Sequence, residues 1–257
     1  MSNTALITGA SSGIGKELAR YHASKGGNLI LAARREAALN DLKRELEAEF
    51  SILAHVFAID LGAEGGAMAL YDAVNSESLR VDILINNAGF GGHGRHIDRG
   101  LATEQSMVDL NVKSLVALTH ELGRDMAAQG GGKILNVGST AGFMPGPLQA
   151  VYFATKAFVN SFSQAIDQEL RPQGVTCTVL APGYVETEFA DVADLGGTSL
   201  VKSGATAESV AKHGYDAMMQ GKLVTINERG LSFMMNWLIP FMPRRAVLKF
   251  TERLQSK

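Results

Sequence analysis

A tyrosine and a lysine stand four residues apart, as Tyr152 and Lys156, near the start of a segment with helical periodicity. Side chains at this spacing share one face of a helix. An ammonium beside a phenol favours the phenolate, so we expect Lys156 to lower the pKa of Tyr152 from about 10 toward working pH. Such a tyrosine can give a proton to a carbonyl oxygen or take one from an alcohol. Taken alone, the pair fits a structural role equally well, with Tyr152 as an amphipathic core residue and Lys156 as a solvated helix charge.

Ser139 lies two residues past the end of a short run, residues 133–137, that has the pattern of a buried strand. In open α/β sheets the ligand crevice lies at the carboxyl ends of the strands. A serine hydroxyl at that edge can hold a substrate oxygen.

A glycine-rich segment, Thr8 to Gly15, lies between the first predicted strand and the first predicted helix. Glycines let the backbone approach a pyrophosphate, and a helix N-terminus adds free N–H donors and positive potential. The alternative is a glycine-rich turn with no ligand, but its place at the first βα turn favours cofactor binding. The expected contacts are Gly9, Ser11, Ser12, Gly13, Ile14 and Gly15.

The end of the second strand indicates which dinucleotide is preferred. A domain selective for NAD carries an acid there, about 20 residues past the glycines, whereas this chain has Arg34. A guanidinium suits a phosphate through paired charged hydrogen bonds. The sequence therefore favours NADP(H) over NAD(H). The alternative is that Arg34 and Arg35 are solvated loop charges.

Strand-like and helix-like segments alternate along most of the chain, which is typical of βαβ units. We expect a single-domain, doubly wound α/β Rossmann fold, with about seven parallel strands and helices on both faces. The expected strands are residues 4–8, 28–33, 52–59, 81–85, 133–137, 175–180 and 223–226. The expected helices are residues 14–25, 103–128, 152–170 and 208–219, together with a helix after the second strand that carries Leu39, Leu42, Leu46 and Phe50 on one stripe.

Composition excludes several other classes of protein. The 257 residues are 46% hydrophobic and 19% charged with a net charge of −2, so neither a disordered chain nor a nucleic-acid surface is expected. Cys177 is the one cysteine, which excludes an intrachain disulfide framework, and we expect it to be a buried small hydrophobe. His93 and His96 lack a third ligand at suitable spacing, so no metal is expected.

Together these motifs resemble the classical short-chain dehydrogenase/reductase family over about residues 4–226. Thr8 to Gly15 matches its TGxxxGxG segment, and Asn86 to Gly89 matches its NNAG segment. The resemblance implies catalytic roles for Asn111, Ser139, Tyr152 and Lys156, with Asn111 holding a relay water and Lys156 also holding the nicotinamide ribose. It adds cofactor contacts at Asp60, Leu61, Asn87, Ala88, Gly89, Pro182, Gly183, Val185 and Thr187. Asp60 could equally cap the following turn. The chain departs from the family at Gly138, where a serine is common.

The resemblance implies an NADPH-dependent oxidoreductase that moves a hydride between the nicotinamide and a ketone, aldehyde or secondary alcohol. A catalytically silent cofactor-binding or scaffold protein on the same fold remains the alternative, as does a peripheral membrane lipid-carbonyl reductase. The small-molecule substrate is not identifiable from the sequence; its specificity would reside in residues 90–101 and 184–205.

Residues 227–257 do not follow the βα rhythm of residues 1–226 and form a distinct tail. Leu231 to Met242 is highly apolar but too short to cross a bilayer, and a basic amphipathic segment, residues 243–257, follows it. We expect the apolar stretch to be buried against its own or a neighbouring subunit. The family resemblance implies a homodimer or homotetramer built on the helices at 103–128 and 152–170. The start of the chain lacks signal-peptide features, so a cytoplasmic location is expected, with peripheral membrane association as an alternative.

Overall fold

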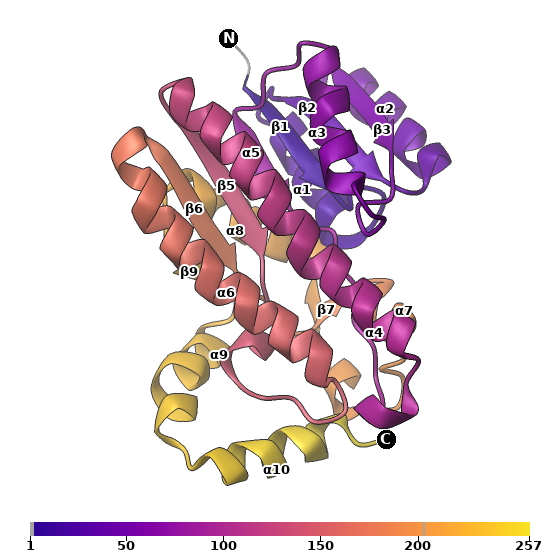
Figure 1. Ribbon diagram of the computed structural model, residues 1–257, viewed down its shortest axis with the longest axis vertical. Coiled ribbons are helices and arrows are strands. Elements are labelled where there is room, and N and C mark those ends of the chain that lie inside the picture. Colours follow the sequence, from indigo (N-terminus) through magenta and orange to yellow (C-terminus); the bar gives the residue numbers. More distant parts are fainter. Residues whose placement is uncertain (1–2, 203) are drawn as a thin grey trace.

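The structure, a computed structural model, describes residues 3–202 and 204–257 (Figure 1). Residues 1 and 2 of the predicted domain and residue 203 of the predicted specificity segment lie outside that description. A parallel sheet forms the centre, with seven strands in the order β3-β2-β1-β4-β5-β6-β9. The strands are β1 (Thr4–Thr8), β2 (Asn28–Ala33), β3 (Ala54–Ala58), β4 (Ile83–Asn86), β5 (Gly132–Val137), β6 (Val175–Leu180) and β9 (Val224–Thr225).

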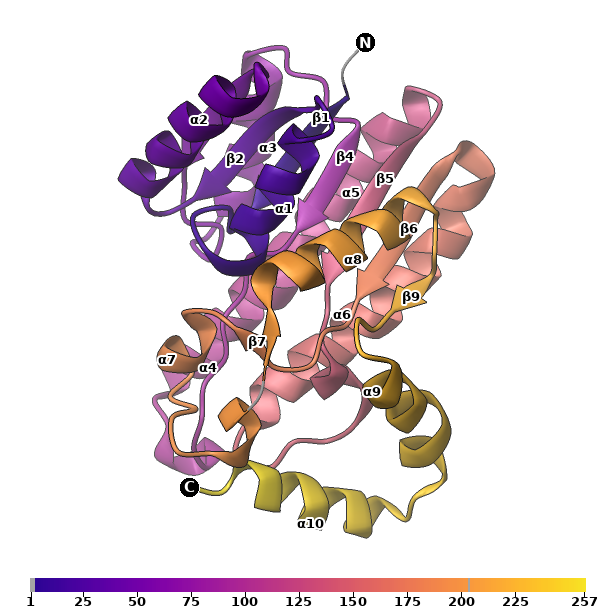
Figure 2. The ribbon, with the colours of Figure 1, turned by 180° about the vertical axis from the view of Figure 1, so that it is seen from behind.

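Helices cover both faces of the sheet, as comparison of Figure 1 with Figure 2 shows. One face is covered by α1 (Gly13–Ala23), α2 (Glu36–Phe50) and α8 (Ala207–Met219), and the other by α3 (Gly66–Ser76), α5 (Leu115–Ala128) and α6 (Ala150–Leu170). Within β1, Ala5 and Ile7 pack toward the first set of helices and Leu6 toward the second. Because both faces are buried, the strands are continuous apolar runs. The predicted doubly wound fold is confirmed.

The observed elements differ from the predicted ones mainly where glycine or a side-chain hydrogen bond intervenes. We predicted no helix between residues 59 and 81, yet α3 lies there, because burial of Leu70 and Val74 compensates for its poorly helical start at Gly65 and Gly66. The single helix predicted for residues 103–128 is α4 (Leu101–Val108), a π-helical segment (Asp109–Ser114) and then α5. The predicted bounds of β1, β2 and β6 match the structure.

Beyond β6 the chain passes over the carboxyl edge of the sheet, and we call the described part of residues 185–206 the roof. It contains β7 (Val185–Glu186), α7 (Phe189–Val192) and β8 (Ala205–Thr206), with β7 and β8 pairing as a separate two-stranded sheet. The tail follows as α9 (Arg229–Phe233), a π-helical segment (Met234–Leu238), a 3₁₀ turn (Ile239–Phe241) and α10 (Arg244–Gln255). Figures 1 and 2 both place α9 and α10 beyond the carboxyl ends of the strands.

Within its own chain the apolar tail is only partly buried, and coverage of its remaining apolar side chains by a neighbouring subunit stays a prediction. Met235, Ile239 and Val247 form a small core with Val179 and Ala181 of the sheet region. A second set of apolar side chains faces solvent, because a short helical hairpin has only one face against the domain. That set includes Phe233, Trp237, Leu238, Phe241 and Met242.

Candidate active site

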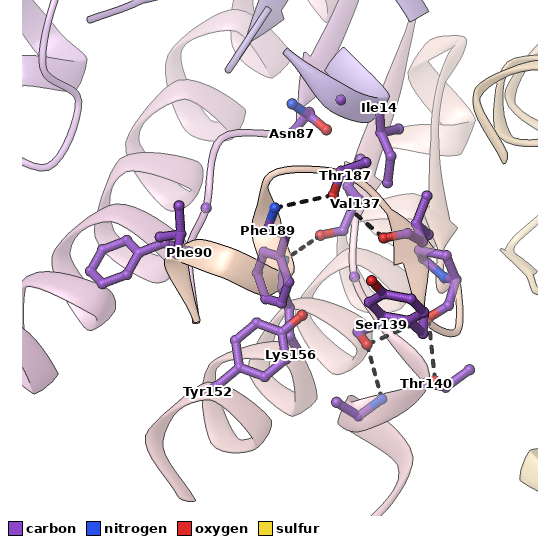
Figure 3. A pocket seen from close by; sticks show the side chains of 18 of the residues that line it. Ile14, Asn87, Phe90, Val137, Ser139, Thr140, Tyr152, Lys156, Thr187 and Phe189 are labelled. Atoms are coloured by element: carbon purple, nitrogen blue, oxygen red, sulfur yellow. Dashed lines mark hydrogen bonds between the residues drawn. The ribbon is translucent and has the colours of Figure 1, made fainter. Parts of the chain in front are cut away.

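A cavity of about 670 Å³ opens at the carboxyl edge of the sheet, beneath the roof segments. Every predicted catalytic or cofactor residue lines it except Gly15 and Asn111. It contains the glycine-rich segment, the ends of β2 to β5 and the start of α6, as expected for a crevice beyond parallel strands. The tertiary structure therefore brings the predicted site residues together (Figure 3).

The glycine-rich segment is shaped for close backbone approach. Gly9 and Gly13 have φ angles of 66° and 54°, in the left-handed region that favours glycine. Gly15 does not line the cavity; a Cβ there would lie 2.4 Å from the Gly9 carbonyl oxygen. Gly15 therefore serves helix–loop packing, and the loop atoms around Gly9 and Gly13 form the cavity wall.

Asn87 and Thr8 join the glycine-rich segment to the end of β4. Asn87 Nδ2 donates to the Thr8 and Gly9 carbonyl oxygens at 2.9 and 3.2 Å. The Thr8 hydroxyl accepts from the main-chain N–H groups of Asn87 and Ala88, both at 3.0 Å. Sequence reasoning did not assign a role to Thr8, although its place at the end of a predicted strand beside the glycines was a usable signal.

Tyr152, Ser139 and Lys156 come from α6 and the end of β5 and lie on one wall of the cavity (Figure 3). The Tyr152 ring packs against Phe189 of α7, with ring centroids 5.3 Å apart. Lys156 Nζ donates to the Val137 carbonyl oxygen at 2.8 Å and lies 5.9 Å from the Tyr152 ring centroid. The Ser139 hydroxyl accepts from the Ala141 N–H at 3.0 Å, which fixes it at the strand end.

Burial dominates the acid–base properties of this group. It raises the pKa of Tyr152 to about 12, with the Ser139 hydroxyl acting in the opposite direction, and it lowers the pKa of Lys156 to about 8. The expectation that Lys156 pulls the Tyr152 pKa below 10 is therefore wrong for this structure. Desolvation of a phenolate outweighs an ammonium that is directed toward Val137. Tyr152 consequently keeps its proton at neutral pH.

Asn111 lies behind the cavity wall, in the π-helical segment. Its Nδ2 donates to the Phe90 carbonyl oxygen at 2.9 Å and to Thr155 Oγ1 at 3.2 Å, and its Oδ1 accepts from the Phe90 N–H at 3.1 Å. The carboxamide thus clamps the loop after β4 against α6. π-Helical turns widen a helix by one residue and often occur at functional sites.

The end of β2 presents two arginines with different surroundings. Arg35 bonds to the Ser11 hydroxyl at 3.2 Å and forms an ion pair with Glu188 at 3.0 Å, so it ties the glycine-rich segment to the roof. Arg34 lines the cavity and is exposed, without a hydrogen-bond or ion-pair partner in the described part of the chain. Sequence reasoning treated Arg35 only as a possible loop charge and missed its bridging contact.

The remaining predicted residues have local roles as well as cavity contacts. Asp60 Oδ1 accepts from the Gly62 N–H at 2.9 Å, so it caps its turn while also lining the cavity. The Pro182 carbonyl oxygen accepts from the Thr140 N–H at 3.0 Å, which anchors the segment 182–187 to the end of β5. Cys177 is buried as predicted, and burial raises its pKa to about 12.

Gly138 has a structural explanation. A Cβ at this position would lie 2.1 Å from Asn160 Oδ1, and Asn160 Nδ2 in turn donates to the Ser139 carbonyl oxygen at 3.0 Å. The Asn160 side chain on α6 occupies the space that a residue-138 side chain would need. The departure from the family pattern therefore leaves the Ser139 main chain well supported.

The family model for short chain dehydrogenases matches residues 3–195 of the chain. The protein belongs to the short-chain dehydrogenase family. Sulfoacetaldehyde reductase 2 of Chromohalobacter salexigens is 39% identical to this short-chain dehydrogenase over 191 residues, covering 74% of the chain and 75% of the relative. The present protein is therefore an oxidoreductase that acts on CH–OH and C=O groups.

Two solved structures with NADPH share the fold of this short-chain dehydrogenase. A short-chain dehydrogenase from Sphingobium yanoikuyae in complex with NADPH superposes with a TM-score of 0.85 at 28% identity, covering 99% of this chain and 98% of that one. L-Sorbose reductase from Gluconobacter frateurii, complexed with NADPH and L-sorbose, gives a TM-score of 0.77 at 26% identity, covering 88% and 94%. No helix in residues 3–202 or 204–257 is long and apolar enough to cross a membrane.

Proposed function

We propose that this short-chain dehydrogenase is an NADPH-dependent carbonyl reductase in which Tyr152 is the proton donor. The convergence of Tyr152, Ser139 and Lys156 on the wall of a cavity that also reaches Arg34 carries the proposal. The NADPH complexes of similar proteins support the choice of cofactor. The small-molecule substrate is a ketone or aldehyde, and the reverse reaction oxidises a secondary alcohol.

The cavity wall fits a phosphorylated nicotinamide dinucleotide. Gly9 and Gly13 line the cavity close to the N-terminus of α1, where N–H groups and the helix dipole favour phosphate. Arg34 would hold the 2′-phosphate, since its guanidinium has no described protein partner. Asp60 and Leu61 would contact the adenine, and Asn87 to Gly89, Pro182, Gly183, Val185 and Thr187 would line the path to the nicotinamide. When bound, the nicotinamide supplies the hydride.

The protein's own residues account for the proton. At neutral pH Tyr152 is protonated, because burial raises its pKa to about 12, so it can donate to an oxygen that becomes an alkoxide. Ser139, fixed by Ala141, would hold the same oxygen by its hydroxyl. Lys156 would hold the ribose hydroxyls and return a proton to Tyr152 after each turnover, since its pKa of about 8 lies near working pH.

The test is NADPH oxidation across ketones, aldehydes, steroids and sugars, with the Tyr152→Phe variant as the decisive comparison. The variant keeps the ring but loses the proton, so NADPH should bind normally while turnover falls by about 10² or more. Tyr71→Phe is the matched control, because Tyr71 lies on α3 and bonds to Asp125 outside the cavity. Near-normal turnover by Tyr152→Phe would refute the assignment. NADPH binding without turnover by the wild-type protein would instead favour the silent scaffold.

A further inference from the structure

The part of the cavity beyond Tyr152 has mostly apolar walls supplied by the roof and the tail. Residues of α6, of α7 and of the C-terminal helices line this part of the cavity. Apolar walls of this kind bind the hydrocarbon part of a ligand, while a few polar groups fix its orientation. The principal apolar side chains are Met144, Phe153, Phe189, Leu195, Leu231 and Met235.

Two carboxamides in this apolar region have side-chain atoms without a hydrogen-bond partner among the residues that the structure describes. Gln255, at the end of α10, is 0% exposed, and neither its Oε1 nor its Nε2 has a hydrogen-bond partner in the described part of the protein. Gln149, just before α6, is 4% exposed, and its Oε1 is likewise unpartnered. Both residues line the cavity. Buried polar groups in proteins are almost always hydrogen-bonded, so unpartnered carboxamide atoms on two residues that line one cavity point to a ligand.

Contacts from three other segments hold the end of α10 in place over the cavity. His93 Nε2 donates to the Gln255 carbonyl oxygen at 2.7 Å, and the Ser199 hydroxyl donates to the Leu254 carbonyl oxygen at 2.9 Å. Lys257 forms an ion pair with Asp194 at 2.8 Å. These contacts hold the last turn of α10, and with it Gln255, against the loop after β4 and against the roof.

The charge of the lining residues restricts the ligand further. Among the cavity-lining residues that the structure describes, the cations are Lys156, Arg34 and Arg35. Lys156 donates to Val137, while Arg34 and Arg35 lie at the end of β2, away from the tail. Burial of an anionic group without a cation is strongly unfavourable. The apolar end of the cavity thus does not suit a sulfonate or carboxylate, unlike the substrate named for the Chromohalobacter relative.

We infer that the substrate is a neutral, largely hydrocarbon ketone that carries a hydroxyl or second carbonyl group far from the reacting carbon. The Gln255 carboxamide binds that distal group, with Gln149 as a second contact. This assignment rests on the proposed carbonyl reductase function and names its substrate class. Gln255 is then a specificity-determining residue, located two positions before the last residue of the chain.

A set of matched ketones tests the inference: cyclohexylcyclohexanone, the same ketone with a hydroxyl on the far ring, the same with a carboxylate there, and sulfoacetaldehyde. Wild-type protein should prefer the hydroxylated ketone over the unsubstituted one by about tenfold or more in kcat/KM, mainly through KM. The two anions should be the poorest substrates. Equal kcat/KM for the first two ketones, or a preference for either anion, would overturn the inference.

Substitution of Gln255 identifies the group responsible. Gln255→Leu should lose the preference for the hydroxylated ketone, so that kcat/KM becomes similar for the two neutral ketones, and Gln255→Met serves if the branched side chain disturbs folding. Gln149→Leu should reduce the preference less. Gln220→Leu, at an exposed position after α8, is the matched control and should behave like wild type. A preference that survives in both Gln255 variants would exclude Gln255 as the specificity determinant.

Calorimetric binding of the same ketones separates this inference from the proposed function. Binding that favours the hydroxylated ketone without any turnover would support the subsite and refute the reductase. Turnover without a difference in binding would support the reductase and refute the subsite. Neither binding nor turnover would refute both.

Discussion

At the residue scale, burial rather than spacing sets the chemistry of the Tyr152 and Lys156 pair. The four-residue interval places both side chains on one helix face, as the sequence indicates. Burial, however, disfavours the charged form of each group, so it raises the pKa of the Tyr152 phenol and lowers the pKa of the Lys156 ammonium. A protonated tyrosine at neutral pH is suited to carbonyl reduction, since that direction requires an acid.

The lowered pKa of Lys156 predicts a pH-dependent stability. Between the folded pKa of about 8 and the unfolded value of about 10.5, the unfolded chain binds more protons, so the free energy of unfolding rises with pH. From pH 7.5 to 9.5 this group should add about 2 kcal/mol. Urea unfolding of wild type and Lys156→Met at both pH values measures the difference. Identical pH slopes for the two proteins would show that Lys156 is not buried as a cation.

Arg34 carries a prediction about cofactor selectivity. Arg34→Ala should weaken NADPH binding by about 1.5–3 kcal/mol, the usual contribution of a charged hydrogen bond, and leave NADH binding almost unchanged. Fluorescence titration with each cofactor measures this. Arg35→Ala is the informative partner variant, because its contacts with Ser11 and Glu188 predict similar losses for both cofactors. A wild-type preference for NADH would refute the NADP(H) assignment.

At the element scale, the interruption between α4 and α5 is the feature that links helix geometry to the site. The π-helical segment presents Asn111 to both main-chain groups of Phe90. A regular helix over residues 101–128 would shift the register by one residue and move this side chain away from the loop.

Asn111→Ala should therefore destabilise the protein by about 1–3 kcal/mol, because main-chain groups of Phe90 lose their partners. Turnover should fall with it, as the loop after β4 supports the cavity wall. Thermal unfolding and NADPH oxidation measure the two effects. Asn75→Ala, on the exposed side of α3, is the control and should change neither. An Asn111→Ala protein as stable as wild type would show that the loop after β4 does not need the Asn111 contacts to keep its conformation.

At the scale of the whole molecule, the tail joins the cavity to a solvent-facing apolar surface. One side of it covers the site, through Leu231, Met235 and Gln255. On the other side, Phe233 is 58% exposed, Trp237 65% and Phe241 80%. Contiguous exposed aromatics of this kind are typical of interaction surfaces. The division at residue 227 and the homo-oligomer both remain predictions.

Light scattering should give the mass of a homodimer or homotetramer at micromolar protein concentration. If the tail contributes to the interface, Trp237→Ser combined with Phe241→Ser should lower that mass while NADPH binding persists, because neither side chain lines the cavity. A clean wild-type monomer would contradict the oligomer. A monomer that floats with anionic liposomes would favour the peripheral membrane alternative, since Arg244, Arg245 and Lys249 are exposed beside the aromatics.

The sequence by itself determined the features that depend on local pattern. Apolar runs buried on both faces defined β1, β2 and β6, and the glycine-rich segment, Tyr152, Lys156 and Arg34 were identifiable because their chemistry depends on neighbours nearby in the chain. The tertiary structure alone decided what depends on burial and on contacts between distant segments. It set the direction of the Tyr152 pKa through desolvation and joined Arg35 to Glu188. It also brought Gln255, from the far end of the chain, into the cavity of Tyr152. No periodicity in a sequence encodes which buried carboxamide lacks a partner, because that depends on every element packed around it.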